Sequence, residues 1–477
     1  MPKNKTFYIT TTLPYVNAEA HLGHALEFVR ADIIARHKRL MGFDVFFNTG
    51  TDEHGVKIYR KALEQKKDPQ EYADEYAAKF KALKEKLDLS FNSFVRTTDE
   101  HHIKAAQEFW KRCEAAGDIY KKIYKINYCV GCELEKTESE LVDGRCPDHP
   151  SLTLENIEEE NYFFRFSKYQ QPLLDLYANN PQFVLPDFRL NEIKRFVERG
   201  LEDFSVSRLK SKMPWGIPVP GDECHIMYVW FDALVNYVSA IGWPDRMEEF
   251  GNWWPVTQYA GKDNLRQQSA IWQAMLMSAK IEPSKQIIIN GFITAAGGVK
   301  MSKSLGNVVN PLDLVAEYGT DALRYYLARE ISVFEDSPFD PETFKAAYNA
   351  SLANGIGNLT NRIMKLAETN LEKPVEVVSQ ELPEEFTSAL DTFEIKQAAD
   401  FVWQKITALD QKIQETKPFS VVKTDKEAGQ KIIIELVAEL YAISQMLVPI
   451  IPDTAEKIQS AIKANKMPAQ PLFLRKD

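Results

Sequence analysis

The chain has 477 residues, more than one hydrophobic core ordinarily serves, so we expect two to four domains. Hydrophobic residues make up 44% and charged residues 26%, which is typical of a soluble globular enzyme and excludes a disordered chain. The net charge of -10 argues against a general nucleic-acid coat protein, although a local basic patch can still bind phosphates. Since no apolar run has the length of a membrane helix and no export signal is recognisable, we expect a cytoplasmic protein without a membrane partner.

The first part of the chain alternates short apolar runs with helical patterns. Residues 7–10 predict a strand, and apolar residues at helical spacing between 22 and 33 predict a helix that ends near Gly42. A second strand is expected at 45–47. The alternation returns with a strand at 256–260, a helix from about 266 to 279 and a strand at 287–289. This order predicts an α/β fold with a parallel sheet, whose ligands bind at the carboxyl ends of the strands.

Two segments depart from this alternation. Residues from Ile119 to about Ser205 hold a cysteine pair, a charged stretch and many turn residues, which indicates an insertion between two halves of one sheet domain. From about residue 340 on, apolar residues follow the helical period, which predicts an α-helical bundle. We therefore expect the two halves of the sheet domain at 1–118 and 206–340, the insertion at 119–205 and the helical domain at 341–477.

A first candidate motif, His21-Leu22-Gly23-His24, opens the first predicted helix. Imidazoles at this place can bond phosphate oxygens, because a helix N-terminus already favours negative charge. Gly23 has no side chain and lets a ribose or a base approach the backbone. Taken alone, two histidines at this spacing could equally be a metal-binding pair or ordinary surface residues.

A second candidate motif is Lys300-Met301-Ser302-Lys303-Ser304, which follows Gly297-Gly298. Two ammonium groups on a glycine-flanked loop suit the charge that develops on a leaving pyrophosphate. A lone pair of lysines at this spacing is more often a solvated loop. The combination with the histidine motif, in this order and on an α/β framework, favours the functional interpretation.

A cysteine cluster forms a separate candidate site. Cys129 and Cys132 are followed by Cys146 and His149, so two closely spaced pairs can chelate one ion and close the loop between them. Four protein ligands leave no open coordination position, which favours one structural Zn²⁺ per chain over a catalytic metal or a chance arrangement. Cys113 and Cys224 have no partner in the sequence pattern and are interpreted as ordinary small residues.

With these motifs the chain resembles the class I aminoacyl-tRNA synthetases, and within them the methionyl-tRNA synthetase family. The resemblance covers nearly the whole chain and weakens after about residue 370. Its matching stretches are Asn17–His24, Gly50–Gly55, Pro214–Pro218, Tyr228–Leu234 and Lys300–Pro311. It implies a Rossmann-type catalytic domain with an inserted zinc-knuckle connective peptide, followed by a helical anticodon-binding domain.

The resemblance also implies a two-step reaction. The carboxylate of L-methionine attacks the α-phosphorus of ATP, and the aminoacyl group then passes to the 3′ end of tRNA(Met). Positioning and charge stabilisation carry most of such catalysis. The resemblance makes His21, His24, Lys300 and Lys303 the catalytic residues and Mg²⁺ the companion of ATP. Its ATP-binding residues are Gly23, His24, Glu27, Lys300, Ser302 and Lys303.

The resemblance further implies an apolar and aromatic pocket for methionine. Asp52 is expected to accept the α-ammonium group. The other pocket residues are Leu13, Tyr15, Trp230, Ala233, Tyr237, Gln268 and Trp272. One departure lies here, because many members of the family carry an aromatic residue or proline and then histidine where this chain has Gln267 and Gln268.

In the helical domain, the resemblance makes Asn358 and Arg362 contacts of the tRNA anticodon. They are four residues apart and share one helix face, where amide and guanidinium groups can bond base edges. Phe419 stands where the family commonly has a tryptophan that stacks on an anticodon base.

Two alternatives stay open from the sequence. One is a class I synthetase for valine, leucine, isoleucine or cysteine, although the insertion is shorter than the roughly 150 residues that a folded editing domain needs. The other is a non-catalytic tRNA-binding relative. Because the chain ends at Asp477, soon after the predicted bundle, we expect no further module and a monomer.

Overall fold

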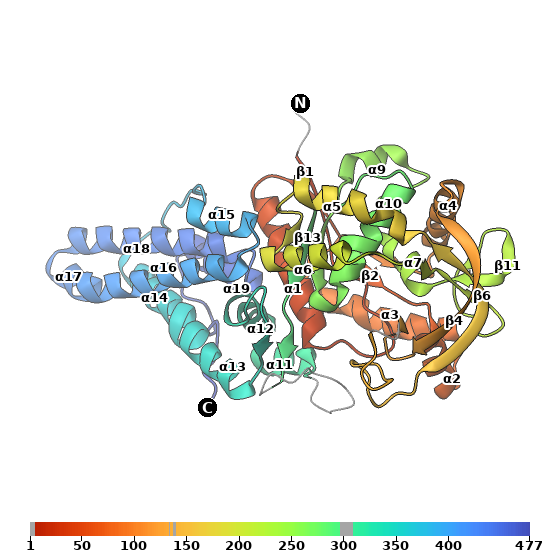
Figure 1. The fold of residues 1–477 in the computed structure, drawn as a ribbon. Helices are drawn as coiled ribbons and strands as arrows, with labels where there is room; N and C mark the ends of the chain where they lie inside the picture. Colours follow the sequence, from red (N-terminus) through yellow and green to blue (C-terminus); the bar gives the residue numbers. More distant parts are fainter. Residues whose placement is uncertain (1–4, 133, 137–139, 296–308) are drawn as a thin grey trace.

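In the described part of the chain, six parallel strands form a central sheet (Figure 1). The computed structural model describes residues 5–132, 134–136, 140–295 and 309–477. The strand order is β3-β2-β1-β12-β13-β7, and all neighbouring pairs are parallel. The strands are β1 (Thr6–Thr10), β2 (Asp44–Thr51), β3 (Ser93–Arg96), β7 (Val184–Leu185), β12 (Thr257–Gly261) and β13 (Gln286–Asn290). The predicted parallel α/β fold is confirmed.

The strand order reverses between β1 and β12. From this point β2 and β3 extend the sheet on one side, and β13 and β7 extend it on the other. Nearly all residues of β1 and β12 are buried, as expected where helices cover both faces of a parallel sheet. A ligand crevice is expected beyond the carboxyl ends of these two strands.

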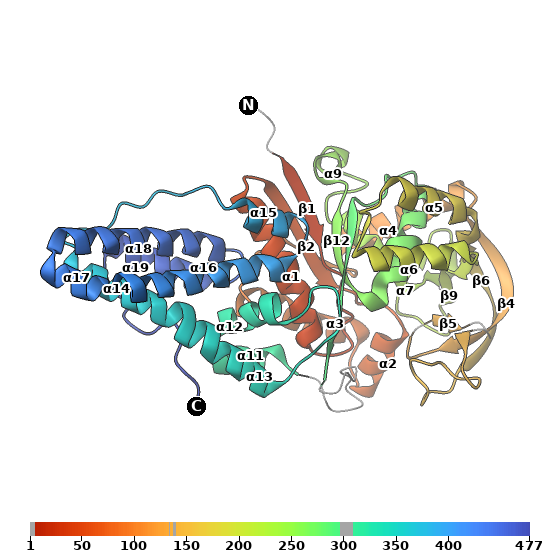
Figure 2. The same ribbon diagram turned by 60° about the vertical axis from the view of Figure 1, so that its left-hand side comes forward.

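Helices pack around the sheet (Figure 2). Helix α1 (Leu22–Leu40) contacts β1, β2 and β12. The helix predicted over 266–279 is interrupted, since a short π-helical segment, η4 (Gln267–Ile271), precedes α10. The remaining helices of this part are α2 (Val56–Glu64), α3 (Pro69–Lys86), α4 (Glu100–Ala115), α7 (Val229–Leu234), α8 (Asn236–Ser239), α9 (Met247–Trp253) and α10 (Trp272–Ser278).

A second, antiparallel sheet lies at the end of the molecule away from the C-terminal helices (Figure 1). Its strand order is β5-β4-β6-β8, and its two long strands, β4 (Ile119–Cys129) and β6 (Glu155–Phe164), pair with each other. After it, α5 (Gln170–Asn179) leads to β7, which pairs with β13 in the central sheet. The other elements here are β5 (Leu134–Lys136), α6 (Asp187–Glu198), β8 (Phe204–Ser205), β9 (Ser207–Leu209), β10 (Pro218–Val219) and β11 (Asp222–Met227).

The chain from about residue 340 folds into packed helices, so the predicted helical bundle is confirmed. Residues 371–383 and 465–477 are exceptions, and the first of these segments is an open connection before α15 in Figure 2. The last helix, α19, begins at Pro452, because proline is favourable at the first position of a helix. Helices α11 (Pro311–Tyr318) and α12 (Thr320–Tyr325) precede the bundle. Its helices are α13 (Pro341–Ala347), α14 (Asn358–Asn370), α15 (Glu384–Asp391), α16 (Ile395–Thr416), α17 (Pro418–Thr424), α18 (Lys426–Leu447) and α19 (Pro452–Ala464).

A buried polar joint connects the sheet to the helical part. Asp32 on α1 and Arg324 on α12 are both fully buried and form an ion pair of 2.8 Å. Arg324 also donates to the backbone carbonyl groups of Pro449 and Ile450, just before α19. Arg30, two positions before Asp32 on α1, donates to carbonyl groups at residues 327 and 331–333. Within the described residues, no helix is both long and apolar enough to cross a membrane.

Candidate active site

The histidine motif forms the N-terminus of α1. His21 Nδ1 accepts a hydrogen bond from the backbone N–H of Gly23 at 3.1 Å, and His24 Nδ1 accepts from the backbone N–H of His21 at 3.2 Å. The two rings stack with their centroids 3.8 Å apart. When Nδ1 accepts, a neutral imidazole carries its proton on Nε2 and can donate from there. Two oriented donors therefore lie at a helix N-terminus, where an anion is favoured.

Val309, near the end of the matched stretch Lys300–Pro311, lies beside the N-terminus of α1. The backbone N–H of Leu22 donates to the carbonyl oxygen of Val309 at 3.1 Å. The predicted residues Lys300, Ser302 and Lys303 lie outside the described residues. At Gly23, a Cβ atom would stand only 2.9 Å from the His21 ring, so a side chain here would displace the imidazole.

Glu27 lies one turn further along α1 and faces the loop that follows β1. Its carboxylate accepts from the backbone N–H of Thr12 at 2.6 Å and from the Thr12 hydroxyl at 2.7 Å. Burial raises the pKa of Glu27 to about 7, although both bonds from Thr12 favour the ionised form. Near neutral pH a large share of this carboxyl group is thus protonated and able to donate.

Asp52 follows the last residue of β2 and lies beside Tyr15, which follows β1. The two residues form a parallel bridge: the Asp52 N–H donates to Pro14, and the Val16 N–H donates to Asp52. The Asp52 side chain is buried, whereas Tyr15 is partly exposed. A carboxylate and an aromatic ring therefore meet at the carboxyl ends of neighbouring strands, beside the reversal of strand order.

A buried cluster of His54, Asp232 and His102 lies beneath this edge. His54 Nδ1 is 3.1 Å from an Asp232 carboxylate oxygen, and His102 Nε2 is 3.8 Å from the other. Burial alone would raise the pKa of Asp232, but the two histidines hold it below its usual range. The Trp215 ring packs edge-on against His54 and donates to the carbonyl oxygen of Glu53 at 2.6 Å. Asp232 thereby ties α7 to the loop that carries Asp52.

The predicted pocket residues come from four elements. Trp230 and Ala233 are partly exposed on α7, Tyr237 is buried on α8 and Trp272 is buried on α10. The rings of Tyr237 and Trp272 have centroids 5.8 Å apart, and Gln268 donates to the Tyr237 hydroxyl at 2.9 Å. Leu13 is partly buried in the loop after β1. The structure thus brings together Tyr15 with Asp52, and Tyr237 with Gln268 and Trp272.

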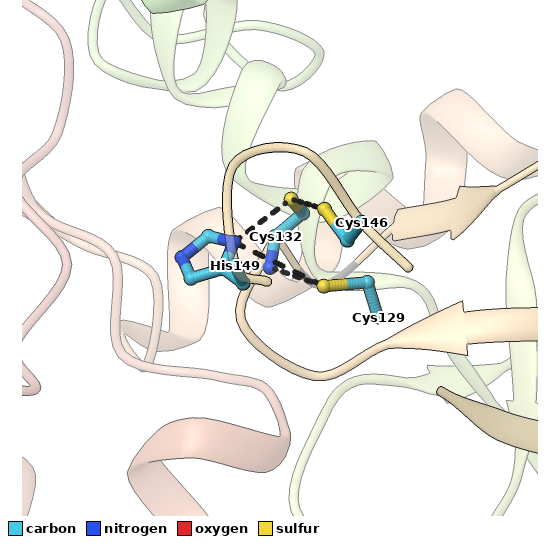
Figure 3. Close-up of side chains that lie close together, drawn as sticks. All are labelled: Cys129, Cys132, Cys146 and His149. Carbon is cyan, nitrogen blue, oxygen red and sulfur yellow. Dashed lines mark hydrogen bonds between the residues drawn. The ribbon is translucent and has the colours of Figure 1, made fainter. Parts of the chain in front are cut away.

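The four side chains of the cysteine cluster lie close together at the end of β4 (Figure 3). The ligand atoms of Cys129, Cys132, Cys146 and His149 all lie within 4.8 Å of one another. Cys132 Sγ is 3.4 Å from Cys146 Sγ and 3.2 Å from His149 Nδ1, and Cys129 Sγ is 3.9 Å from the same nitrogen. Tetrahedral zinc would separate two sulfurs by about 3.8 Å and sulfur from nitrogen by about 3.6 Å. Three sulfurs and one nitrogen at these distances fit a four-coordinate metal ion.

The loop of this cluster also contacts the start of α2, the helix that follows the loop after β2. Lys57 Nζ donates to the carbonyl oxygen of Gly131 at 2.5 Å, and the same ammonium lies 5.8 Å from the centre of the Tyr15 ring. A Cβ atom at Gly131 would come within 2.3 Å of the His149 ring. Gly131 is therefore required for the close approach of His149.

Two of the predicted anticodon residues share a shallow groove in the helical part. Arg362 on α14 and Phe419 on α17 line a groove of about 400 Å³ together with Lys365 and Ile413. Phe419 is 46% exposed, and Arg362 forms an ion pair with Asp410. Asn358, at the start of α14, is exposed and is not part of the groove lining. A cation and an exposed aromatic ring in one groove suit an unstacked base.

The sequence patterns missed several contacts. His54 and Asp232 lie inside the stretches quoted for the family resemblance, yet their pairing is formed only by the fold. Thr12, which bonds Glu27, lies in the loop after β1 and carries no motif of its own. The presence of a histidine and an aspartate in two matched stretches was the one signal that the sequence offered.

Comparisons with known proteins agree over the whole chain. Residues 7–156 and 151–364 match the family described as tRNA synthetases class I (M), and residues 367–471 match the anticodon-binding domain of methionyl tRNA ligase. Methionine–tRNA ligase of Thermotoga maritima is 40% identical over 97% of this chain and 76% of its own length. Methionine–tRNA ligase of a Synechocystis strain is 41% identical over 95% of this chain and 88% of its own length.

Solved structures lead to the same result. Mycobacterium tuberculosis methionyl-tRNA synthetase in complex with methionyl-adenylate superposes with a TM-score of 0.89 at 36% identity, covering 95% of this chain and 93% of that one. The apo form of the Mycobacterium tuberculosis enzyme has a TM-score of 0.82 at 32% identity, covering 99% of both chains. The family resemblance on the motifs, the parallel sheet with its histidine-capped helix and these matches agree: the chain belongs to the methionyl group of the class I tRNA synthetases.

Proposed function

We propose that this chain is an aminoacyl-tRNA ligase that activates L-methionine with ATP and transfers it to tRNA(Met). The observation that carries the proposal is the pair of stacked histidines at the N-terminus of α1, beside the reversal of strand order. The start of α1 is also bonded to Val309, five positions after the last residue of the lysine motif. Relatives named methionine–tRNA ligase and a relative solved with methionyl-adenylate support the substrate.

In the first step the methionine carboxylate forms a bond to the α-phosphorus of ATP, and the bond to the bridging oxygen of pyrophosphate breaks. His21 and His24 donate to the phosphate oxygens from their ordered positions, and Glu27 and Gly23 face the nucleotide. Lys300 and Lys303 hold the leaving pyrophosphate. When it is bound with ATP, Mg²⁺ neutralises part of the phosphate charge.

In the second step a ribose hydroxyl at the 3′ end of the tRNA attacks the carbonyl carbon, and AMP leaves. Asp52 accepts the α-ammonium group of methionine through both steps. The side chain lies among Leu13, Tyr15, Trp230, Ala233, Tyr237, Gln268 and Trp272. Arg362 and Phe419 contact anticodon bases in their shared groove, and Asn358 contacts the same loop of the tRNA.

We further propose that Cys129, Cys132, Cys146 and His149 hold one structural Zn²⁺. The start of β4 at Ile119 and the end of β8 at Ser205 support the division into domains at 1–118, 119–205, 206–340 and 341–477. The chain would act as a monomer in the cytoplasm, where its tRNA is used.

The test is methionine-dependent ATP–pyrophosphate exchange, with the amino acids offered one at a time and Lys303→Ala as the control. Exchange with methionine alone would establish the reaction and the substrate. Exchange with another amino acid would retain the mechanism and overturn the pocket, and exchange with none by folded protein would favour a non-catalytic tRNA-binding relative. Elemental analysis of protein purified without chelators tests the zinc site, which a metal-free result would contradict.

A further inference from the structure

The ammonium group of Lys57 contacts two separate parts of the molecule. Lys57 is the second residue of α2, which begins after Gly55 turns the chain with a φ of 106°. Its Nζ donates to the carbonyl oxygen of Gly131 at 2.5 Å and lies 5.8 Å from the centre of the Tyr15 ring. Lys57 and Tyr15 are both partly buried. One side chain therefore joins the loop of the cysteine cluster to a residue that the family resemblance assigns to the methionine pocket.

The carbonyl group of Gly131 belongs to the turn between the first two cysteines of the cluster. Gly131 stands between Cys129 and Cys132, and the backbone N–H of Cys132 donates to Cys129 Sγ at 3.5 Å. A metal ion that holds both sulfurs fixes this turn, and with it the direction of the Gly131 carbonyl group. Loss of the ion would release the turn and leave the Lys57 ammonium with a less ordered acceptor.

The ring of Tyr15 depends on side-chain contacts for its orientation. The bridge to Asp52 fixes the backbone of Tyr15, but the side chain of a partly buried residue can still change its rotamer. The face of an aromatic ring attracts a cation within about 6 Å of its centre. An ammonium group that Gly131 holds in place thus favours the ring orientation observed here. Because Asp52 and Tyr15 are both expected to contact methionine, this orientation bears on methionine binding.

We propose that Lys57 is a positioning residue that couples the cysteine cluster to the methionine pocket, so that metal and methionine strengthen each other's binding. The metal orders the turn at Gly131, the turn orders the ammonium group, and the ammonium group holds the ring of Tyr15. The inference rests on the proposed function, because it needs methionine beside Tyr15 and Zn²⁺ in the cluster. Such coupling is reciprocal, so each ligand tightens the other by the same factor.

The experiment measures two affinities in Lys57→Met, which removes the ammonium group and keeps a long side chain. The first is the Kd of L-methionine for zinc-loaded protein, measured by isothermal titration calorimetry. It should rise about two- to fivefold, the value of one cation–π contact at an exposed site. The second is the Kd of Zn²⁺, measured by competition with a chromogenic chelator. Saturating methionine should lower this Kd by a similar factor in the unaltered protein and should leave it unchanged in Lys57→Met.

Lys61→Met is the matched control, because Lys61 lies one turn further along α2 and pairs with Glu64 at the surface. Both affinities should stay the same in this variant. Lys57→Arg retains a cation with several donors and should restore most of the coupling. In a Tyr15→Leu background, Lys57→Met should not raise the Kd of methionine further, since the ring through which it acts is gone. If Lys57→Met does not fold, Lys57→Gln, which also removes the charge, takes its place.

The outcomes separate this inference from the proposed function. An unchanged methionine Kd in the folded variant would overturn the inference and leave the proposed function in place. An equal rise with and without the Tyr15 ring would do the same, because Lys57 would then act without that ring. An effect of methionine on Zn²⁺ affinity that persists in Lys57→Met would show that the coupling takes another route. If the unaltered protein neither binds nor exchanges methionine, the proposed function fails, and this inference with it.

Discussion

Replacing Asp32 by asparagine should destabilise the protein, because Asp32 holds the joint between the sheet and the C-terminal helices. Its carboxylate pairs with Arg324 and Arg36, each at 2.8 Å, and accepts from the backbone N–H and the hydroxyl of Ser90, both at 2.6 Å. Asp32 and Arg324 are fully buried. Loss of the carboxylate would leave the buried Arg324 guanidinium without its ion-pair partner.

Breaking a buried ion pair on one side costs about 3–5 kcal/mol. We expect the lower end, about 3 kcal/mol, since Arg324 keeps its hydrogen bonds to the carbonyl oxygens of Leu87, Asp88, Pro449 and Ile450. For a cooperative unit of 150–250 residues this lowers Tm by roughly 6–12 °C. The assay is thermal unfolding at pH 7 followed by circular dichroism.

The loss should depend on pH in a definite direction. Burial alone would raise the pKa of Asp32, but Arg324, Arg36 and Ser90 hold it below its usual range. A lowered pKa in the folded protein gives a stabilisation that is complete above about pH 4 and is lost as the pH falls through the folded value. The difference in Tm between Asp32→Asn and the unaltered protein should therefore be constant from pH 5 to 8 and shrink below pH 4.

Asp88→Asn is the matched control, because the Asp88 side chain is 46% exposed and pairs with Arg36 at the surface. Such a pair contributes at most about 1 kcal/mol. If Asp32→Asn lowered Tm no more than Asp88→Asn does, the buried pair would not be what holds the joint.

Three further changes test other parts of the molecule. Gly131→Val should reduce bound metal at least severalfold in elemental analysis, because the new side chain collides with the ring of His149. Arg362→Ala should lower tRNA charging by roughly tenfold, the value of one side-chain contact to a base, and leave pyrophosphate exchange nearly unchanged. Glu27→Gln should raise Tm above that of the unaltered protein at pH 8, with the difference closing toward pH 5. In the folded protein the pKa of Glu27 is raised from 4.5 to about 7. Ionisation of Glu27 therefore destabilises the folded protein as the pH rises from about 4.5 through 7, by about 1–3 kcal/mol at most.

Each of these predictions has its own control. Gly251→Ala adds a methyl group where no neighbouring atom lies within 4 Å, so its metal content should not change. Asp410→Ala removes the ion pair of Arg362 without removing the guanidinium, so a tenfold loss in this variant would mean that the pair, and not base contact, matters. A Glu27→Gln difference that stays constant with pH would show that ionisation of the carboxyl group has no part in it.

The features that the sequence predicted well depend on residues close together in the chain. The spacing from His21 to His24 is one helical turn, so a helix alone places both rings together. The sequence spacings from Cys129 to Cys132 and from Cys146 to His149 are likewise short. The parallel sheet followed from strands separated by helices, a pattern that leaves few other arrangements.

What could not be predicted depends on partners far apart in the chain. His54 and Asp232 are separated by 178 positions, and Gln258 reaches Gln268 only because the chain turns from β12 into η4. Strand β7 has two residues, too few for a periodic pattern, and its place beside β13 is set by neighbouring elements. Pairings of this kind follow from how the elements pack, and single-sequence periodicity carries no information about that.

The loop after β2 is the place where these long-range contacts converge. Asp52 begins it, Trp215 donates to Glu53, and Asp232 pairs with His54. Lys57, at the start of the following helix α2, donates to Gly131 in the cysteine cluster. A loop and a helix start that are held from three separate segments have little freedom to move the carboxylate of Asp52. The cysteine cluster thus contacts the helix that directly follows the loop of the predicted ammonium-binding residue, which gives a structural metal a physical route to substrate binding without any contact to the substrate.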